Sequence, residues 1–267
     1  MIRAGVVGNP IGHSLSPLIH RAWIAAAGPD GAYDAYEPQD EAAFLALIDI
    51  GRAGRLRGLN VTAPYKLAAL AAADSVSETA RRAGSANLLV FEDGRVRADS
   101  TDGLGLMAAL VEQAPNLRLA GRPAVVLGAG GAGRAAAAAL SDAGAEVRIV
   151  NRTHERALAL AADLGVTAMA AEAALDGAAL VVNALSATPD IDPSRLLGDA
   201  VLMDMTYRPL ETPFLAAGRA RGLTGVDGLA MLIGQARPSF EALFGEAPPA
   251  VDVRALALEA QALENGR

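Results

Sequence analysis

The fold is decided by Ala124-Val125-Val126-Leu127-Gly128-Ala129-Gly130-Gly131-Ala132-Gly133, where an apolar strand runs directly into glycines spaced as G-x-G-x-x-G. An alanine-rich helix is expected immediately afterwards, over 134–143. The spacing allows a tight turn, a close approach of the backbone to a pyrophosphate, and phosphate binding at the helix N-terminus. The stretch predicts a dinucleotide site formed by Gly128, Ala129, Gly130, Gly131 and Ala132. The alternative is a helix whose glycines serve packing alone.

The next expected strand, 146–150, indicates which dinucleotide is bound. It ends in Asn151-Arg152-Thr153-His154-Glu155-Arg156. An acidic residue at this place would bind the ribose 2′-hydroxyl of NAD. Arg152, Thr153 and Arg156 instead offer positive charge and a hydrogen-bond donor to a 2′-phosphate, which favours NADP as the cofactor. Solvated residues at the start of a helix are the alternative interpretation.

Strands and helices alternate on both sides of the glycine stretch, which predicts an α/β fold. Helices are expected over 41–50, 74–83 and 104–111, and a linker is indicated by Pro115 and by Gly121-Arg122-Pro123. Further strands are expected at 2–8, 32–37, 58–61, 179–183, 201–204 and 223–226. Two more are expected, one that is entered at Asn87 within 84–91 and one that ends within 96–103.

The sequence predicts two domains with a cleft between them. An N-terminal α/β substrate domain with a mixed sheet is expected over 1–102 plus 236–267, and a Rossmann-like NADP-binding domain over 103–235. Helices expected over 228–244 and 251–264 do not fit the plan of a six-stranded dinucleotide-binding sheet. For this reason we expect the chain to return to the first domain at its end.

A single lysine stands in a chain with twenty-two arginines. Lys66 closes the stretch Gly58-Leu59-Asn60-Val61-Thr62-Ala63-Pro64-Tyr65-Lys66 and is expected at the start of a helix, near the carboxyl edge of the sheet where α/β sites lie. A guanidinium stays protonated, whereas an ammonium can release its proton, which suits lysine to acid/base catalysis. The sequence therefore indicates Lys66 as a catalytic residue. A surface lysine that arose by chance is the alternative.

Polar side chains also lie at two further places where a loop or strand leads into an expected helix. Ser14 and Ser16 precede Pro17 at an expected helix start, with Ser16 as its cap, and a helix N-terminus with two hydroxyls is a natural seat for a carboxylate. Capping alone is the alternative for both serines. Asp102 lies where an expected strand meets a helix, and it too could serve only as a cap.

Composition restricts the classes of partner. The net charge of −7, the isoelectric point of about 5.0 and the absence of a basic cluster argue against nucleic acid or an anionic membrane surface. Three histidines and no cysteines leave little for a metal site, and no metal is expected. The missing cysteines fit a reducing cytoplasm. No apolar run approaches the roughly 18 residues that a spanning helix needs. We expect a small-molecule substrate and a monomer or homodimer.

The chain resembles the shikimate dehydrogenase family over nearly its full length. The similarity rests on several separate motifs in the order of the family, which are Gly8-Asn9-Pro10-Ile11-Gly12-His13-Ser14-Leu15-Ser16-Pro17, Asn60-Val61-Thr62-Ala63-Pro64-Tyr65-Lys66, Thr101-Asp102-Gly103, the Gly128 to Gly133 loop, Asn151-Arg152-Thr153, and Gly228-Leu229-Ala230-Met231-Leu232-Ile233-Gly234-Gln235-Ala236.

The resemblance implies NADP-dependent interconversion of 3-dehydroshikimate and shikimate, in the pathway to chorismate and the aromatic amino acids. It implies that Lys66 is the acid/base and that Asp102 works beside it. On the substrate side it implies carboxylate binding by Ser14, Ser16 and Tyr207, and binding of ring hydroxyls by Thr62, Asn87, Asp102 and Gln235. On the cofactor side it implies the glycine loop, Asn151, Arg152, Thr153, Arg156, Met205, Gly228 and Met231.

Two departures from the family pattern leave the substrate open. This chain has Asn87-Leu88-Leu89 where the family usually has Asn-Thr-Leu, and Ser100-Thr101-Asp102 where it usually has Asn-Thr-Asp. Quinate, an amino-shikimate or another hydroxylated cyclic carboxylate is therefore the alternative substrate. A second alternative, from a different class, is a regulatory protein that binds NADP without turnover, against which the pair Lys66 and Asp102 argues.

Overall fold

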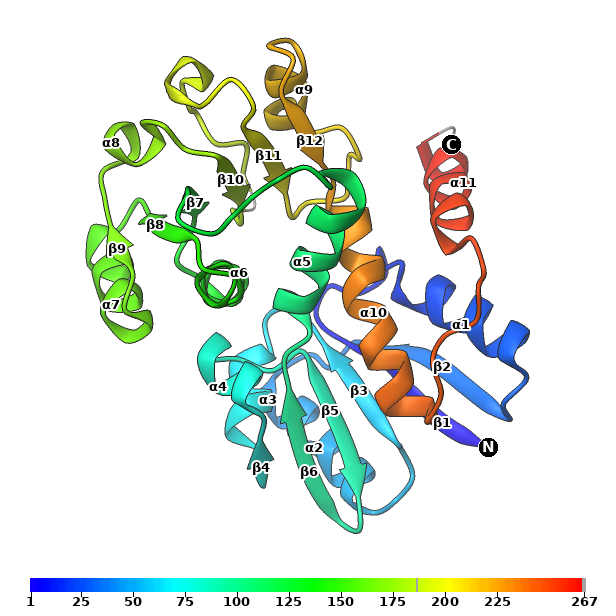
Figure 1. The fold of residues 1–267 in the computed structure, drawn as a ribbon. Coiled ribbons are helices and arrows are strands. Elements are labelled where there is room, and N and C mark those ends of the chain that lie inside the picture. Colours follow the sequence, from blue (N-terminus) through cyan, green and yellow to red (C-terminus); the bar gives the residue numbers. More distant parts are fainter. Residues whose placement is uncertain (186, 266–267) are drawn as a thin grey trace. The chain divides into compact units, whose positions relative to one another are not determined.

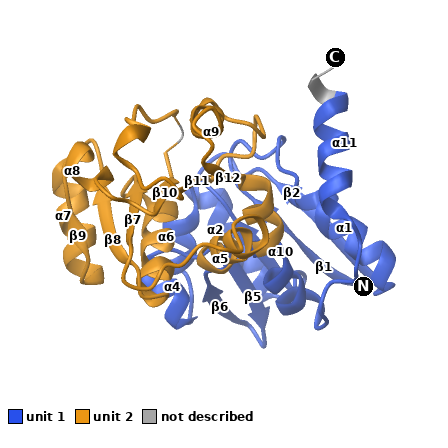
Figure 2. Cartoon of the chain, turned by 45° about the horizontal axis from the view of Figure 1, so that its top comes forward, with its two compact units in different colours: residues 1–101, 235–267 blue, residues 102–234 orange. Residues whose placement is uncertain are grey.

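Figure 1 shows the chain as a computed structural model, which describes residues 1–185 and 187–265. The chain forms two compact units, and Figure 2 gives them different colours. Unit 1 consists of Met1–Thr101 and Gln235–Arg267, and unit 2 of Asp102–Gly234.

Unit 1 is built on a mixed six-stranded sheet in the order β2-β1-β3-β5-β6-β4. β1 is parallel to β2 and β3, whereas β5 is antiparallel to β3 and β6. The mixed sheet predicted for the N-terminal part is confirmed. The elements before the crossing to unit 2 are β1 (Ile2–Val7), α1 (Ser16–Ala27), β2 (Gly31–Tyr36), α2 (Glu41–Arg52), β3 (Gly58–Val61), α3 (Lys66–Ala71), β4 (Ser75–Val76), α4 (Glu78–Ala83), β5 (Leu88–Glu92) and β6 (Arg95–Asp99).

Unit 2 is built on a parallel six-stranded sheet in the order β12-β11-β10-β7-β8-β9. Counted from β7 as the first strand, this is the Rossmann order 3-2-1-4-5-6 read from the β9 edge. Its elements are α5 (Asp102–Gln113), β7 (Pro123–Leu127), α6 (Gly131–Asp142), β8 (Glu146–Val150), α7 (His154–Leu164), β9 (Thr167–Ala168), α8 (Ala171–Leu175), β10 (Leu180–Asn183), η1 (Pro193–Arg195), β11 (Val201–Asp204), α9 (Pro213–Arg219) and β12 (Thr224–Val226). The predicted Rossmann-like fold is confirmed.

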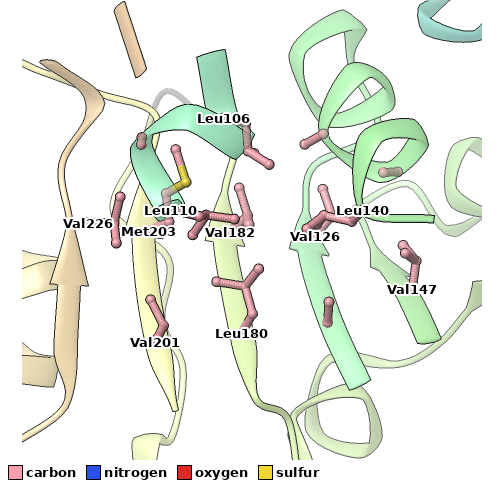
Figure 3. Close-up of a cluster of buried hydrophobic side chains, with 14 of the residues drawn as sticks. Leu106, Leu110, Val126, Leu140, Val147, Leu180, Val182, Val201, Met203 and Val226 are labelled. Carbon is pink, nitrogen blue, oxygen red and sulfur yellow. The ribbon is translucent and has the colours of Figure 1, made fainter. Parts of the chain in front are cut away.

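The strands of unit 2 alternate between two apolar layers, because successive side chains of a strand point to opposite faces of the sheet. Val126 and Val182 pack with Leu106, Leu110 and Leu140, from α5 and α6, on the face shown in Figure 3. Their neighbours Val125 and Val181 pack on the other face with Leu175 of α8 and Phe214 and Leu215 of α9. Since both faces are covered, the central strands β7, β10 and β11 are almost continuously apolar in the sequence.

The prediction of a helix over 74–83 is wrong for its first residues. Residues Ser75–Val76 form β4, which pairs with β6, and α4 begins only at Glu78. The side chain of Asp74 accepts a hydrogen bond of 2.7 Å from the backbone N–H of Val96, which holds the segment against the sheet. Ser77 then caps α4 by accepting from the N–H of Ala80. Pairing with a distant strand therefore overrides the local helical pattern. The short strand β9 was also not expected.

Two helices end the chain: α10 (Gly228–Phe244), which begins in unit 2, and α11 (Val253–Asn265). Within unit 1, Phe240 of α10 is fully buried and packs edge-on against Trp23 of α1 at a ring-centroid distance of 5.5 Å. Phe240 also stacks on Phe244 at 4.8 Å. These rings fasten the second half of α10 to the N-terminal unit.

His20 makes the stability of the fold depend on pH. It is 1% exposed, stacks on Tyr33 at 4.0 Å, and its Nδ1 has no hydrogen-bond partner among the described residues. Burial lowers the pKa of His20 from 6.5 to about 3. Between these values the unfolded chain binds a proton that the folded chain does not. The contribution is fully present above about pH 6.5 and is lost as the pH falls towards 3, by at most about 1.4 kcal/mol per pH unit.

We expect the free energy of unfolding to fall less steeply between pH 7 and pH 5 in His20→Phe than in the unchanged protein. Urea unfolding at several pH values measures the slopes. His154→Gln, which removes an exposed histidine, is the matched control and should keep the full slope. Equal slopes for all three proteins would show that His20 does not carry the pH dependence.

Candidate functional site

One edge of the unit 1 sheet gathers the loops that carry the predicted substrate residues. The carboxyl ends of β1 and β3 lie side by side, with Val7 opposite Val61, and the antiparallel β5 begins at this same edge opposite the end of β6, with Leu88 opposite Asp99. The loops holding Ser14 and Ser16, Thr62 and Lys66, Asn87, and Thr101 all leave or enter the sheet there. The topology therefore brings residues from four distant segments to one edge.

Lys66 begins α3, and its backbone is held on both sides. The preceding Tyr65 is 4% exposed, stacks on Phe44 at 4.8 Å, and donates a hydrogen bond of 2.7 Å from its hydroxyl to the carbonyl of Pro38. The carbonyl of Lys66 accepts from the N–H of Ala86 at 3.0 Å, one residue before Asn87. Lys66 is therefore partly buried and fixed beside the segment that carries Asn87.

The start of α1 differs in one detail from the expectation. Ser16 is the first residue of the helix rather than its cap, and no side-chain hydrogen bond caps α1 at Leu15. The hydroxyl of Ser14 instead accepts from the N–H of Ser16 at 3.3 Å, because the loop turns back there. Among the described residues the hydroxyl of Ser16 has no partner, which leaves it available to a ligand.

Asn87 and Gln235 meet within unit 1. The side-chain nitrogen of Asn87 donates to the side-chain oxygen of Gln235 at 3.2 Å and to the hydroxyl of Thr101 at 3.0 Å. The side-chain oxygen of Asn87 accepts from the backbone N–H of Thr101 at 2.7 Å. The structure thus places two predicted hydroxyl-binding residues in direct contact, across 148 positions of the sequence.

In unit 2 the glycine loop follows β7 at the point where the strand order reverses, between β7 and β10. Gly128 has φ of 116°, a conformation that side chains rarely adopt. A Cβ on Gly133 would lie 2.1 Å from the carbonyl oxygen of Gly128, so only glycine lets α6 begin this close to the strand. At Gly130 a Cβ would meet no atom within 4 Å. This open approach to the start of α6 fits a phosphate group.

The end of β8 carries the predicted 2′-phosphate residues. Asn151 joins this segment to the glycine loop, since its side chain accepts from the N–H of Ala129 at 3.2 Å and donates to the carbonyl of Thr153 at 2.9 Å. Arg152, Thr153 and Arg156 are exposed, and neither guanidinium has an ion-pair partner among the described residues. The donors present here fit NADP, with two unpaired positive charges beside the glycine loop.

The loop after β11 is held by an aspartate that the sequence analysis did not single out. Asp204 is 1% exposed and accepts hydrogen bonds from the N–H of Thr206 at 2.9 Å, the hydroxyl of Thr212 at 2.7 Å and the side chain of Asn183 at 3.2 Å. These bonds shape the loop that carries Met205 and Tyr207. An acidic residue closing the apolar run Val201–Asp204 was the available signal.

Comparison with known proteins decides the family. Residues 6–89 match the family model for the shikimate dehydrogenase substrate-binding domain, and residues 109–197 match the model for shikimate / quinate 5-dehydrogenase. The chain is 50% identical to the shikimate dehydrogenase (NADP(+)) of Caulobacter vibrioides, over 97% of this chain and 95% of that protein. The chain belongs to the shikimate dehydrogenase family.

Solved structures of the shikimate dehydrogenase family share the whole fold. The shikimate 5-dehydrogenase of Thermus thermophilus, in complex with NADP(H) and shikimate, is 38% identical, with a TM-score of 0.89 and coverage of 97% of this chain and 100% of that chain. The quinate dehydrogenase of Corynebacterium glutamicum, in complex with NAD, is 31% identical, with a TM-score of 0.86 and coverage of 98% and 99%. The family thus includes proteins named for both substrates that the sequence analysis left open.

Three further residues that the family resemblance implies, Asp102, Gly228 and Met231, belong to unit 2. Asp102 is 3% exposed and begins α5 directly after Thr101, and Gly228 begins α10. Met231 is 6% exposed and belongs to the apolar core of unit 2, so its cofactor role remains a prediction.

Within residues 1–185 and 187–265, no three His, Asp or Glu side chains group as a metal ion requires. None of the helices in these ranges is long and apolar enough to cross a membrane.

Proposed function

We propose that this protein interconverts 3-dehydroshikimate and shikimate with NADP as the cofactor, in the pathway to chorismate and the aromatic amino acids. One observation carries the proposal. The only lysine of the chain begins α3 at the sheet edge where Asn87 and Gln235 also lie, in a chain 50% identical to a shikimate dehydrogenase over 97% of its length.

Substrate recognition is assigned to residues of the unit 1 edge. Ser14 and Ser16 at the start of α1 bind the carboxylate, favoured by the positive end of the helix dipole. Thr62, Asn87 and Gln235 bind ring hydroxyls. From unit 2, Tyr207 is assigned to the carboxylate and Asp102 to a ring hydroxyl.

Acid/base chemistry is assigned to Lys66. When bound, the cofactor would supply the hydride as NADPH in reduction and would accept it as NADP⁺ in oxidation. In reduction, Lys66 donates a proton to the carbonyl oxygen of the substrate as that oxygen becomes a hydroxyl; in oxidation, Lys66 takes the proton from the same hydroxyl. Asp102 is assigned as the partner of Lys66 in this step, and its carboxylate orients the ammonium that gives the proton. Such positioned proton transfer typically contributes about 10²- to 10⁴-fold in rate.

Cofactor binding is assigned to unit 2. Gly128 and Ala129 form the turn, with their N–H groups bonded to Val150 and Asn151, and the N–H groups of Gly130, Gly131 and Ala132 at the start of α6 hold the pyrophosphate. Arg152 and Arg156 pair with the 2′-phosphate, and Thr153 donates a hydrogen bond to it. Met205, Gly228 and Met231 are assigned to the nicotinamide end.

Quinate remains the second candidate substrate, motivated by Leu88 and Ser100. Leu88 is 1% exposed and Ser100 is 3% exposed, so both departures from the family pattern lie in the interior. Leu88 directly follows Asn87, and Ser100 directly precedes Thr101, so both departures adjoin predicted substrate residues. The kinetic comparison of the two substrates decides between them.

Steady-state kinetics with shikimate and quinate, each with NADP and NAD, tests the function. We expect the highest kcat/KM for shikimate with NADP. A higher kcat/KM for quinate would establish the second candidate, and NADP binding without turnover of any such substrate would establish the non-catalytic alternative. We also propose a monomer or homodimer that acts in the cytoplasm, and light scattering on a sizing column measures the oligomeric state.

A further inference from the structure

A buried hydroxyl on α10 lies at the centre of a polar network behind the substrate residues. Ser239 is fully buried, and its Oγ is 2.9 Å from the side-chain nitrogen of Asn60, 3.0 Å from the backbone oxygen of Gln235 and 3.4 Å from the Oγ1 of Thr101. These partners come from β3, from α10 itself and from the loop after β6. One hydroxyl therefore joins three segments of unit 1.

The donors and acceptors of this network follow from its geometry. Asn60 Nδ2 must donate to Ser239, and Ser239 donates its own proton to the carbonyl of Gln235, which leaves Ser239 only as an acceptor for the hydroxyl of Thr101. That hydroxyl also lies 3.3 Å from Asn87 Oδ1, an oxygen that accepts a bond of 2.7 Å from the backbone N–H of Thr101 and has a second lone pair. The Thr101 hydroxyl therefore donates either to Ser239 or to Asn87 Oδ1, and it accepts from Asn87 Nδ2 at 3.0 Å.

A tyrosine fixes the far end of the network. Tyr33 is 1% exposed and donates from its hydroxyl to Asn60 Oδ1 at 2.8 Å. This bond decides which end of the Asn60 amide faces the tyrosine, so the nitrogen faces Ser239. Tyr33 therefore fixes the Asn60 amide, and the Asn60 amide donates to Ser239. Ser239 in turn contacts Thr101, which bonds Asn87.

The network determines what Gln235 presents to a ligand. Asn87 accepts at its oxygen from the N–H of Thr101 and donates from its nitrogen to Gln235 Oε1. The oxygen of the Gln235 amide is therefore turned towards Asn87. Its nitrogen makes no hydrogen bond among the described residues, and the side chain is partly exposed. Gln235 consequently offers its N–H groups, as a donor, to a substrate oxygen.

We propose that Ser239 is a positioning residue for the substrate: its buried hydroxyl ties the backbone of Gln235 to Thr101, whose N–H fixes the Asn87 amide, and so holds Gln235 in place to donate to a ring hydroxyl. The proposal rests on the function proposed above. It assigns Ser239, Asn60 and Tyr33 to a supporting layer that touches no substrate. A hydroxyl that only stabilised the core would change folding without changing which substrate groups are bound.

Ser239→Ala tests the proposal by kinetics. Contacts to a ring hydroxyl are made both before and during hydride transfer, so their loss raises KM and spares kcat. We expect the KM for shikimate to rise about ten-fold, with kcat and the KM for NADP changed less than about two-fold. Ser85→Ala, which removes another fully buried hydroxyl of unit 1 with only a local bond to Ala83, is the matched control and should keep wild-type kinetics.

Tyr33→Phe provides a milder second variant, because it removes one hydroxyl and keeps the ring. We expect a smaller rise in the KM for shikimate, and the double variant with Ser239→Ala should equal Ser239→Ala alone, since Tyr33 acts through Ser239. An unchanged KM for shikimate in Ser239→Ala, an equal rise in the KM for NADP, or additive effects in the double variant would each overturn the proposal.

A binding-independent measurement separates this proposal from the proposed function. Hydrogen exchange of the Asn87 side-chain amide, followed by NMR on the free protein, should be about five-fold faster or more in Ser239→Ala, and unchanged in Ser85→Ala. If the unchanged protein fails to oxidise shikimate, the proposed function is wrong, and the exchange rates alone decide whether Ser239 orders the amides. Equal exchange in all variants would overturn the role of Ser239.

Discussion

Lys66→Ala is expected to lower kcat for shikimate oxidation by about 10²- to 10⁴-fold while changing the KM for shikimate far less. In the proposed mechanism the side chain takes part in the transfer of a proton, and that transfer belongs to the transition state. Removing it therefore costs rate rather than binding. Steady-state kinetics at saturating NADP measures both constants.

Lys66→Arg is the sharper variant, because it keeps the positive charge and approximate length but not the ability to release a proton. It should lose nearly as much kcat as Lys66→Ala if proton transfer is the role of the lysine. Recovery of most of the rate with arginine would show that only the charge matters, and an unchanged kcat in Lys66→Ala would remove the residue from the mechanism. Leu67→Ala, at the exposed neighbouring position, is the control and should retain activity.

Arg152→Asp is expected to shift the ratio of kcat/KM between NADP and NAD towards NAD by about 100-fold. The substitution removes one of two unpaired guanidinium groups at the end of β8 and puts a carboxylate in its place. That carboxylate repels a 2′-phosphate and can accept a hydrogen bond from the 2′-hydroxyl of NAD. Initial rates with each cofactor, at saturating shikimate, give the ratio.

A matched control separates this local effect from a change in overall charge. Arg118→Asp makes the same charge change at an exposed position before β7, on the amino edge of the sheet. It should leave the cofactor ratio unchanged. Retained preference for NADP in Arg152→Asp would show that the 2′-phosphate is bound elsewhere, and Arg156→Asp would then be the next variant to measure.

Local sequence predicted the elements whose pattern depends on short-range chemistry. The glycine spacing after Val125-Val126-Leu127 predicted the Rossmann-like fold of unit 2, because only glycine permits the turn at Gly128 and the close start of α6 at Gly133. The strands Gly58–Val61, Glu146–Val150 and Val201–Asp204 begin and end where the sequence predicted. Each is short, rich in Val, Leu or Ile, and followed by turn or loop residues, so neighbours in the chain are enough to define it.

Contacts between distant segments could not be predicted in this way. The strand β4 forms only because β6 is present to pair with it, and the start of α1 depends on the turn of the preceding loop. Asp204 became recognisable as the residue that shapes the loop after β11 only from its three hydrogen bonds. Asp204 offered one local signal, an acidic residue that closes an apolar run, but the run does not show which groups the carboxylate bonds.

The sequence by itself determined that this is a two-part α/β protein of the shikimate dehydrogenase family, with a lysine whose chemistry stands apart from that of its many arginines. Only the tertiary structure decided how the predicted substrate residues are oriented. Ser239 lies 179 positions from Asn60 and 138 from Thr101, yet one buried hydroxyl joins all three. The direction of a hydrogen bond depends on which donors and acceptors meet in space. The spacing of residues along the sequence does not show which groups meet.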